Sequence, residues 1–195
     1  MNIVVFASGN GSTLQSIIDS IQKKELDVNI TLVVSNNEDA YALERAKDVH
    51  IDTYVIKGNT TEEIDLELVE VLEGYDVDLI VLAGYLKRIG ERLIERYQII
   101  NTHPSLLPKF GGKGMYGMKV HKAVIEAKEE YSGATIHYVN SEYDEGDIIS
   151  QTIVRVTPED TPDSLSAKVQ KAEKIQLIEV LQNLTNEKTE SSYKR

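Results

Sequence analysis

Short apolar runs alternate with amphipathic segments along the first hundred residues of the chain. The apolar runs fall at residues 2–7, 30–34, 51–56, 79–83 and 99–102. Continuous apolar runs of this length are typical of strands buried on both faces of a parallel sheet. The segments between them carry hydrophobic residues at helical spacing, which predicts helices over residues 14–23, 41–48, 61–72 and 90–97. The alternation therefore predicts βαβ units with right-handed crossovers.

The pattern changes after Pro108. A glycine-rich loop at residues 111–117 precedes a predicted helix over 119–127, and residues 134–139 and 148–156 have the pattern of two further strands. The short loop between these strands favours antiparallel pairing, because a parallel crossover needs a longer connection. A closing helix is expected over residues 163–182, with Thr161 as its N-cap and Pro162 at its first position.

These elements predict an α/β fold: a Rossmann-like, mostly parallel sheet with helices on both faces and an antiparallel C-terminal extension. We expect a single domain over residues 1–184, followed by a polar tail over 185–195.

Composition narrows the function classes. The 195 residues include 32 acidic and 21 basic side chains, a net charge of −11, which argues against a broad nucleic-acid surface. The absence of cysteine excludes disulfides, cysteine-ligated metals and a cysteine nucleophile. No apolar run approaches the roughly 20 residues that span a bilayer, and the N-terminus lacks the features of a signal peptide. We therefore expect a cytoplasmic protein without nucleic-acid or membrane partners.

A glycine-containing turn, Ser8–Thr13, connects the first predicted strand to the first helix. Glycines at such a place let backbone amides approach an anion at the helix N-terminus. The third glycine of a dinucleotide fingerprint is replaced by Leu14, and no Gly-Lys-Ser/Thr motif follows. The turn therefore indicates another kind of phosphate cradle, with hydroxyl donors from Ser12 and Thr13. The alternative is an ordinary strand-to-helix turn.

Asn101 and His103 follow the fifth predicted strand, where the carboxyl ends of parallel strands bind ligands. Residues two apart in an extended chain share one face, so the amide and the imidazole could both donate to one developing oxyanion. The alternative is a structural turn next to Pro104.

The loop at residues 140–147 is acidic, and a carboxylate there could orient or charge His103. A solvated acidic turn is the alternative, and the spacing does not fit a calcium loop. His137 could reach the same site or cap a face of the core.

Together these motifs resemble the folate-dependent phosphoribosylglycinamide formyltransferases. The matching segments span residues 2 to about 182. They are Ser8-Gly9-Asn10-Gly11-Ser12, Leu82-Ala83-Gly84-Tyr85, Asn101-x-His103-Pro104-Ser105-Leu106-Leu107-Pro108, Lys113-Gly114-Met115-Tyr116-Gly117 with Val120-His121, Gly133-Ala134-Thr135-Ile136-His137 and Asp144-x-Gly146.

The resemblance implies a formyltransferase fold and a transfer from 10-formyltetrahydrofolate, a cosubstrate, to glycinamide ribonucleotide, with no permanently bound cofactor or metal. It implies small-molecule partners and a monomer or homodimer. The implied catalytic residues are Asn101, His103 and Asp144. The implied substrate-binding residues are Gly11, Ser12 and Thr13 for the phosphate and Glu173 for the ribose. The implied folate-binding residues are Leu86, Lys87, Arg88, Ile89, Asn101, Val139 and Asn140.

Three positions depart from the pattern of the family: Thr13 replaces an asparagine, Lys87 replaces an arginine, and Thr61 stands where some members bind the folate tail with arginine. We also expect Asp144 to raise the pKa of His103, so that the imidazolium persists at neutral pH. Two other functions stay open. A formyltetrahydrofolate hydrolase would carry a second histidine in place of Pro104, and a non-catalytic nucleotide-binding regulator would leave the three polar residues without a role.

Overall fold

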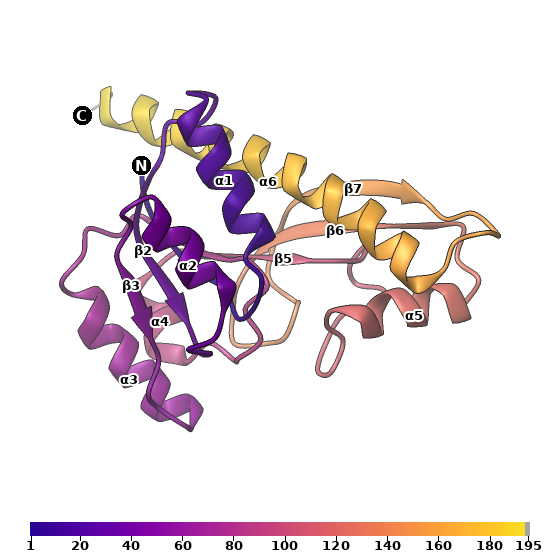
Figure 1. The fold of residues 1–195 in the computed structure, drawn as a ribbon, viewed down its shortest axis with the longest axis horizontal. Coiled ribbons are helices and arrows are strands. Elements are labelled where there is room, and N and C mark those ends of the chain that lie inside the picture. The colour runs from indigo at the N-terminus through magenta and orange to yellow at the C-terminus, as the bar shows by residue number, and fades with distance from the viewer. Residues whose placement is uncertain (194–195) are drawn as a thin grey trace. The chain divides into compact units, whose positions relative to one another are not determined.

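The computed structural model describes residues 1–193, with side chains through Glu190 (Figure 1). Its strands form one sheet in the order β3-β2-β1-β4-β5-β6-β7. The strands are β1 (Asn2–Phe6), β2 (Asn29–Ser35), β3 (Thr53–Val55), β4 (Leu79–Leu82), β5 (Ile99–His103), β6 (Tyr131–Tyr138) and β7 (Ile148–Arg155). The helices are α1 (Ser12–Gln22), α2 (Tyr41–Asp48), α3 (Thr61–Leu72), α4 (Glu91–Arg96), α5 (Met118–Glu126) and α6 (Pro162–Tyr193). The predicted α/β class with a mostly parallel sheet is confirmed.

The chain divides into two compact units. The first contains residues 1–100 and the end of α6 from Leu181. In this unit β1 pairs in parallel with β2 and with β4, and β2 pairs in parallel with β3. Residues Ile3 to Phe6 are fully buried. Burial on both faces explains why the strands of this unit are uninterrupted apolar runs.

The second unit contains residues 101–180. Here β6 and β7 pair antiparallel, from Tyr131 opposite Arg155 to His137 opposite Ile148, as the short loop between them predicted. α5, β6 and α6 contribute the core of this unit, which consists of Val120, Val124, Ala134, Leu165 and Val169. β6 begins at Tyr131, three residues before the predicted start. Gly133 has a low strand propensity and hides this beginning in the sequence, but the backbone of residues 131–133 still pairs with β7.

The start of α6 follows its predicted cap. Thr161 Oγ1 accepts from the Ser164 amide at 3.2 Å, and Ser164 Oγ accepts from the Thr161 amide at 3.0 Å. The predicted end at residue 182 is wrong, because the helix continues to Tyr193. Thr185 is buried and donates to the Leu181 carbonyl at 2.7 Å, so a polar segment without glycine or proline continues the helix. The assignment of residues 1–184 to one domain stays a prediction.

Within residues 1–193, no helix is both long enough and apolar enough to cross a membrane. The same described residues hold no group of three or more histidine, aspartate or glutamate side chains placed to bind a metal ion.

We predict that Leu165→Ala lowers the free energy of unfolding by about 2–5 kcal/mol, because it leaves a cavity in the core of the second unit. Ile175→Ala is the control on the same helix. Ile175 is 56% exposed, so the change should stay within about 0.5 kcal/mol. Urea unfolding followed by circular dichroism measures both. Equal losses in the two variants would contradict this description of the core.

Candidate active site

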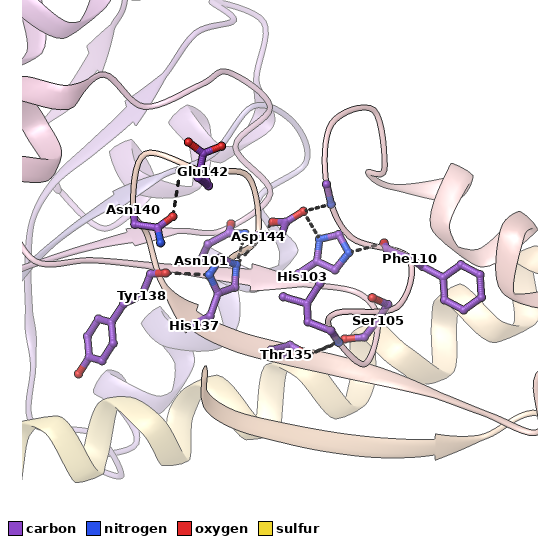
Figure 2. Close-up of polar contacts among 12 residues, drawn as sticks. Asn101, His103, Ser105, Phe110, Thr135, His137, Tyr138, Asn140, Glu142 and Asp144 are labelled. Carbon is purple, nitrogen blue, oxygen red and sulfur yellow. Dashed lines mark hydrogen bonds and ion pairs between the residues drawn. The ribbon is translucent and has the colours of Figure 1, made fainter. Parts of the chain in front are cut away.

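Asn101 and His103 lie on β5, which includes His103 and so extends one residue beyond the predicted strand. Because side chains alternate along a strand, the two share one face. Asn101 is half-buried and only 4% of the His103 side chain is exposed. Figure 2 shows the His103 ring facing Asp144, which comes from the loop between β6 and β7, and the Asn101 side chain next to His137, which also contacts Asp144. The structure therefore brings together the three polar residues that the sequence singled out.

Asp144 contacts both sides of this group. Its Oδ2 atom lies 3.5 Å from His103 Nδ1 and accepts from the Gly112 amide at 2.9 Å, while Oδ1 lies 3.6 Å from His137 Nε2. The loop can approach β6 because residue 146 is glycine: a Cβ atom there would lie 1.7 Å from the Tyr138 carbonyl oxygen. The predicted contact between Asp144 and His103 is confirmed, and the acidic loop is not simply solvated.

The second nitrogen of His103 is also occupied. Nε2 lies 2.8 Å from the carbonyl oxygen of Phe110 (Figure 2). A carbonyl oxygen only accepts, so Nε2 carries a proton and donates it. In the neutral imidazole the lone pair is then on Nδ1, the nitrogen that faces Asp144. Nδ1 is therefore the atom at which His103 can gain and lose a proton.

Burial lowers the pKa of His103 more than its partners raise it. Desolvation is the largest cause, Asp144 and the Phe110 carbonyl oppose it, and His137 adds to it. The expectation of a raised pKa is therefore wrong, because the imidazole is almost completely removed from water. Burial raises the pKa of the Asp144 carboxyl, but its contacts with His137, His103 and the Gly112 amide outweigh this and lower it overall. The resting site thus pairs a carboxylate with a neutral imidazole at neutral pH.

His137 belongs to this site, the first of the two roles that the sequence left open. Its Nδ1 lies 2.8 Å from the Tyr138 carbonyl oxygen and its Nε2 lies 3.2 Å from Asn101 Nδ2. Nδ1 donates to that carbonyl, because a carbonyl oxygen only accepts. Nε2 faces both Asn101 Nδ2 and Asp144 Oδ1, which lies 3.6 Å away. His137 therefore links the Asn101 amide to the Asp144 carboxylate.

A buried threonine supports the turn that presents the Phe110 carbonyl. Thr135 Oγ1, on β6, donates to the Ser105 carbonyl at 2.7 Å and accepts from the Leu107 amide at 3.1 Å. Ser105 Oγ in turn donates to the Lys109 carbonyl at 2.6 Å. These bonds fix the backbone between β5 and Phe110, and no side-chain pattern in the sequence indicated them.

Glu173, on α6, is buried and accepts from Thr102 Oγ1 at 3.1 Å. Thr102 lies between Asn101 and His103 on β5, so alternation places its side chain on the opposite face of the strand. The structure thus does not bring Glu173 to the face that carries the three polar residues. Besides Asn101, this unit contains two further folate candidates. Val139 is half-buried and Asn140 is exposed, and the side-chain oxygen of Asn140 accepts from the Glu142 amide at 3.0 Å.

The other four folate candidates lie after β4 in the first unit. Ile89 is buried, Lys87 and Arg88 are exposed, and Leu86 is 60% exposed. The Leu86 amide donates to Ser8 Oγ at 2.9 Å, which ties this segment to the end of β1.

The N-terminal turn of the first unit leads into α1 through a left-handed glycine. Gly11 has φ +72° and serves as the N-cap of α1, and a Cβ atom there would lie 2.7 Å from both Ala42 Cα and Ala42 Cβ. Gly11 has no side chain that could cap α1, which begins at Ser12, and the first turn of the helix contains no acidic residue. The amides of Ser12 and Thr13 thus belong to a helix N-terminus of positive potential.

Comparison with known proteins identifies the family of the chain. A model of the formyl transferase family matches residues 1–181, so the chain belongs to that family. A relative from Escherichia coli named phosphoribosylglycinamide formyltransferase is 36% identical over 178 residues, covering 89% of this chain and 82% of the relative. A chloroplastic relative of the same name from Arabidopsis thaliana is 42% identical over 192 residues, covering 95% of this chain.

The solved structure of glycinamide ribonucleotide transformylase 1 from Symbiobacterium toebii superimposes with a TM-score of 0.87 at 32% identity. The match covers 93% of this chain and 86% of that one. The plant relatives are longer: this chain spans 66% of the Arabidopsis thaliana protein and 61% of the Vigna unguiculata protein.

We predict that His103 titrates below the ordinary imidazole pKa of about 6.5, and that Asp144→Asn lowers the value further. The Asp144 carboxylate is the main group that stabilises the His103 imidazolium and so opposes the effect of burial. Its removal should therefore favour the neutral ring. NMR titration of the imidazole carbon-bound protons measures both values. Glu142→Gln, which removes one charge from an exposed position in the same loop, should leave the titration unchanged. A His103 pKa that stays constant in Asp144→Asn would refute the coupling.

Proposed function

We propose that this protein transfers the formyl group of 10-formyltetrahydrofolate to the amine of glycinamide ribonucleotide. The products are formylglycinamide ribonucleotide and tetrahydrofolate, and the reaction is a step of purine biosynthesis. The observation that carries the proposal is the convergence of Asn101, His103 and Asp144 at the end of β5, in a chain whose relatives bear the name of this activity.

In the first step, the amine nitrogen attacks the formyl carbon and the electron pair of the C=O π bond moves to oxygen. Asn101, whose amide nitrogen lies 3.2 Å from His137 Nε2, donates an Nδ2 proton to the resulting oxyanion. The attacking nitrogen becomes positively charged and loses a proton to Nδ1 of His103, directly or through one water. Neutral His103 suits this task, and its low resting pKa keeps it neutral.

In the second step, the tetrahedral intermediate collapses. The carbonyl bond re-forms, the bond from carbon to N10 breaks, and its electron pair stays on N10. The proton held at Nδ1 of His103 moves to N10, so that His103 returns to its neutral state. Asp144 stabilises the imidazolium between the two steps, since its carboxylate lies 3.5 Å from Nδ1 and remains ionised.

Binding is assigned to separate groups of residues. Gly11, Ser12 and Thr13 would hold the substrate phosphate with backbone amides and hydroxyls, and Glu173 would bind the ribose hydroxyls. The residues proposed for the folate are Leu86, Lys87, Arg88, Ile89, Asn101, Val139 and Asn140. The protein would act in the cytoplasm as a monomer or homodimer, on small molecules rather than nucleic acid.

A formyl-transfer assay with purified protein tests the proposal. Tetrahydrofolate should form from 10-formyltetrahydrofolate only when glycinamide ribonucleotide is present. His103→Ala should lower kcat by about two orders of magnitude or more, because it removes the group that carries the proton. His50→Asn is the control, since His50 is exposed and its left-handed backbone tolerates asparagine.

Two results would overturn the proposal. Equal release of formate without acceptor would indicate a hydrolase, and failure to bind a folate analogue in calorimetry would indicate a regulator.

We predict that Gly11→Ala raises the KM for glycinamide ribonucleotide by about ten-fold or more and leaves the KM for 10-formyltetrahydrofolate unchanged. The new Cβ atom would meet the backbone of Ala42 and strain a left-handed residue, which displaces the amides that follow. Gly74→Ala, at a position with ordinary van der Waals space in the same unit, is the control. A parallel rise in the KM values for both substrates would show that the turn has only a structural role.

A further inference from the structure

Arg45, on helix α2, contacts both the N-terminal turn and the start of α1. Arg45 Nε donates to the Asn10 backbone carbonyl at 2.8 Å, and Nη2 donates to the Asn10 side-chain oxygen at 3.0 Å. Its Nη1 donates to Gln15 Oε1, on α1, at 2.9 Å. All three nitrogens of the guanidinium are thus engaged, and they join the residue before Gly11 to the first turns of α1.

The turn is also fixed by the backbone of α2. The Ala42 amide donates to the Gly9 carbonyl at 3.1 Å, and Gly11 packs directly against Ala42. Tyr41, the first residue of α2, places its ring 4.7 Å from the Arg45 guanidinium carbon. Gly9, Asn10 and Gly11 are therefore each held by a different contact with α2. Of these contacts, only those of Arg45 depend on a side chain that can be exchanged without altering the helix.

We infer that Arg45 is a positioning residue for phosphate recognition, an inference that rests on the proposed role of Gly11, Ser12 and Thr13. Its planar fork fixes Asn10 and Gln15 on the two sides of Gly11, and thereby sets the direction of the amides at the start of α1. Arg45 acts through Asn10 and Gln15, to which each of its three nitrogens donates one hydrogen bond.

The charge of Arg45 contributes in a second way. All three groups that accept from it are uncharged amide or carbonyl oxygens. Its positive charge is therefore not neutralised by a carboxylate partner at the turn, in a chain whose net charge is −11 and whose overall field repels anions. Arg45 thus contributes both the orientation of the turn and a local positive potential. Two substitutions separate these contributions.

The experiment compares Arg45→Lys, which keeps the charge, with Arg45→Gln, which removes it. A lysine ammonium cannot reproduce a fork that reaches Asn10 twice and Gln15 once. We expect the KM for glycinamide ribonucleotide to rise by about ten-fold to a hundred-fold in Arg45→Lys, because small displacements of binding groups have effects of this size. Arg45→Gln should show a larger rise, while kcat and the KM for 10-formyltetrahydrofolate stay within about two-fold of the wild type in both variants.

Lys47→Gln is the matched control. It removes one positive charge from the same helix, at an exposed side chain paired with Glu44 at 2.8 Å, and should leave every kinetic constant unchanged. Competitive inhibition by inorganic phosphate gives a second readout, and the inhibition constant should rise in the two Arg45 variants and not in Lys47→Gln.

The outcomes separate this inference from the proposed function. A wild-type protein that does not formylate glycinamide ribonucleotide would refute the proposed function. A wild-type protein that does so, with an Arg45→Lys variant of unchanged KM, would overturn the positioning role alone. A loss of thermal stability with parallel changes in both KM values would likewise overturn it, because it would show a purely structural role.

Discussion

The proposed chemistry depends on one backbone hydrogen bond, from His103 Nε2 to the carbonyl of Phe110. Because a carbonyl can only accept, this bond decides which imidazole nitrogen is free to exchange a proton. The surrounding structure maintains it. β5 ends at His103, and Thr135 fixes the turn that leads toward Phe110. The Gly112 amide, two residues further on, fixes the carboxylate of Asp144. One short stretch of chain thus positions both partners of the imidazole.

Burial and charge act on His103 in opposite directions. In the proposed mechanism, desolvation alone would leave an imidazole too weakly basic to take a proton from the attacking amine. A dominant carboxylate would instead leave the imidazole protonated before the substrate arrived. In the structure, burial exceeds the effect of Asp144 without removing it. The resting ring is then neutral, and its protonated form still has a partner. A proton carrier that acts in two steps needs both properties, since it must accept in one step and donate in the next.

The sequence predicts those features of the fold that depend on residues close together in the chain. Apolar runs predicted the buried strands, and the short 140–147 loop predicted an antiparallel pair, because each signal lies within a few residues. The meeting of Asp144 with His103, 41 positions apart, followed from an acidic loop and a resemblance to known enzymes. The Phe110 carbonyl had no such signal, since every residue has a carbonyl. The direction of the His103 pKa shift could not be predicted, because burial depends on the packing around the ring. The end of α6 could not be predicted from its polar residues, because polar composition alone does not end a helix.

In both proposed functional sites, a charged side chain is hydrogen-bonded to, or faces, neutral polar groups rather than a side chain of opposite charge. Asp144 accepts from a backbone amide and faces a neutral imidazole at rest, and Arg45 donates only to carbonyl and amide oxygens. A full salt bridge at either place would fix the side chain equally well, but it would cancel the potential that an incoming group experiences. Neutral partners orient the charged group without cancelling its electrostatic field. The field of Asp144 can then stabilise an imidazolium, and the field of Arg45 can attract a phosphate. In a chain with 32 acidic and 21 basic residues, this is how a local positive potential survives a negative overall field.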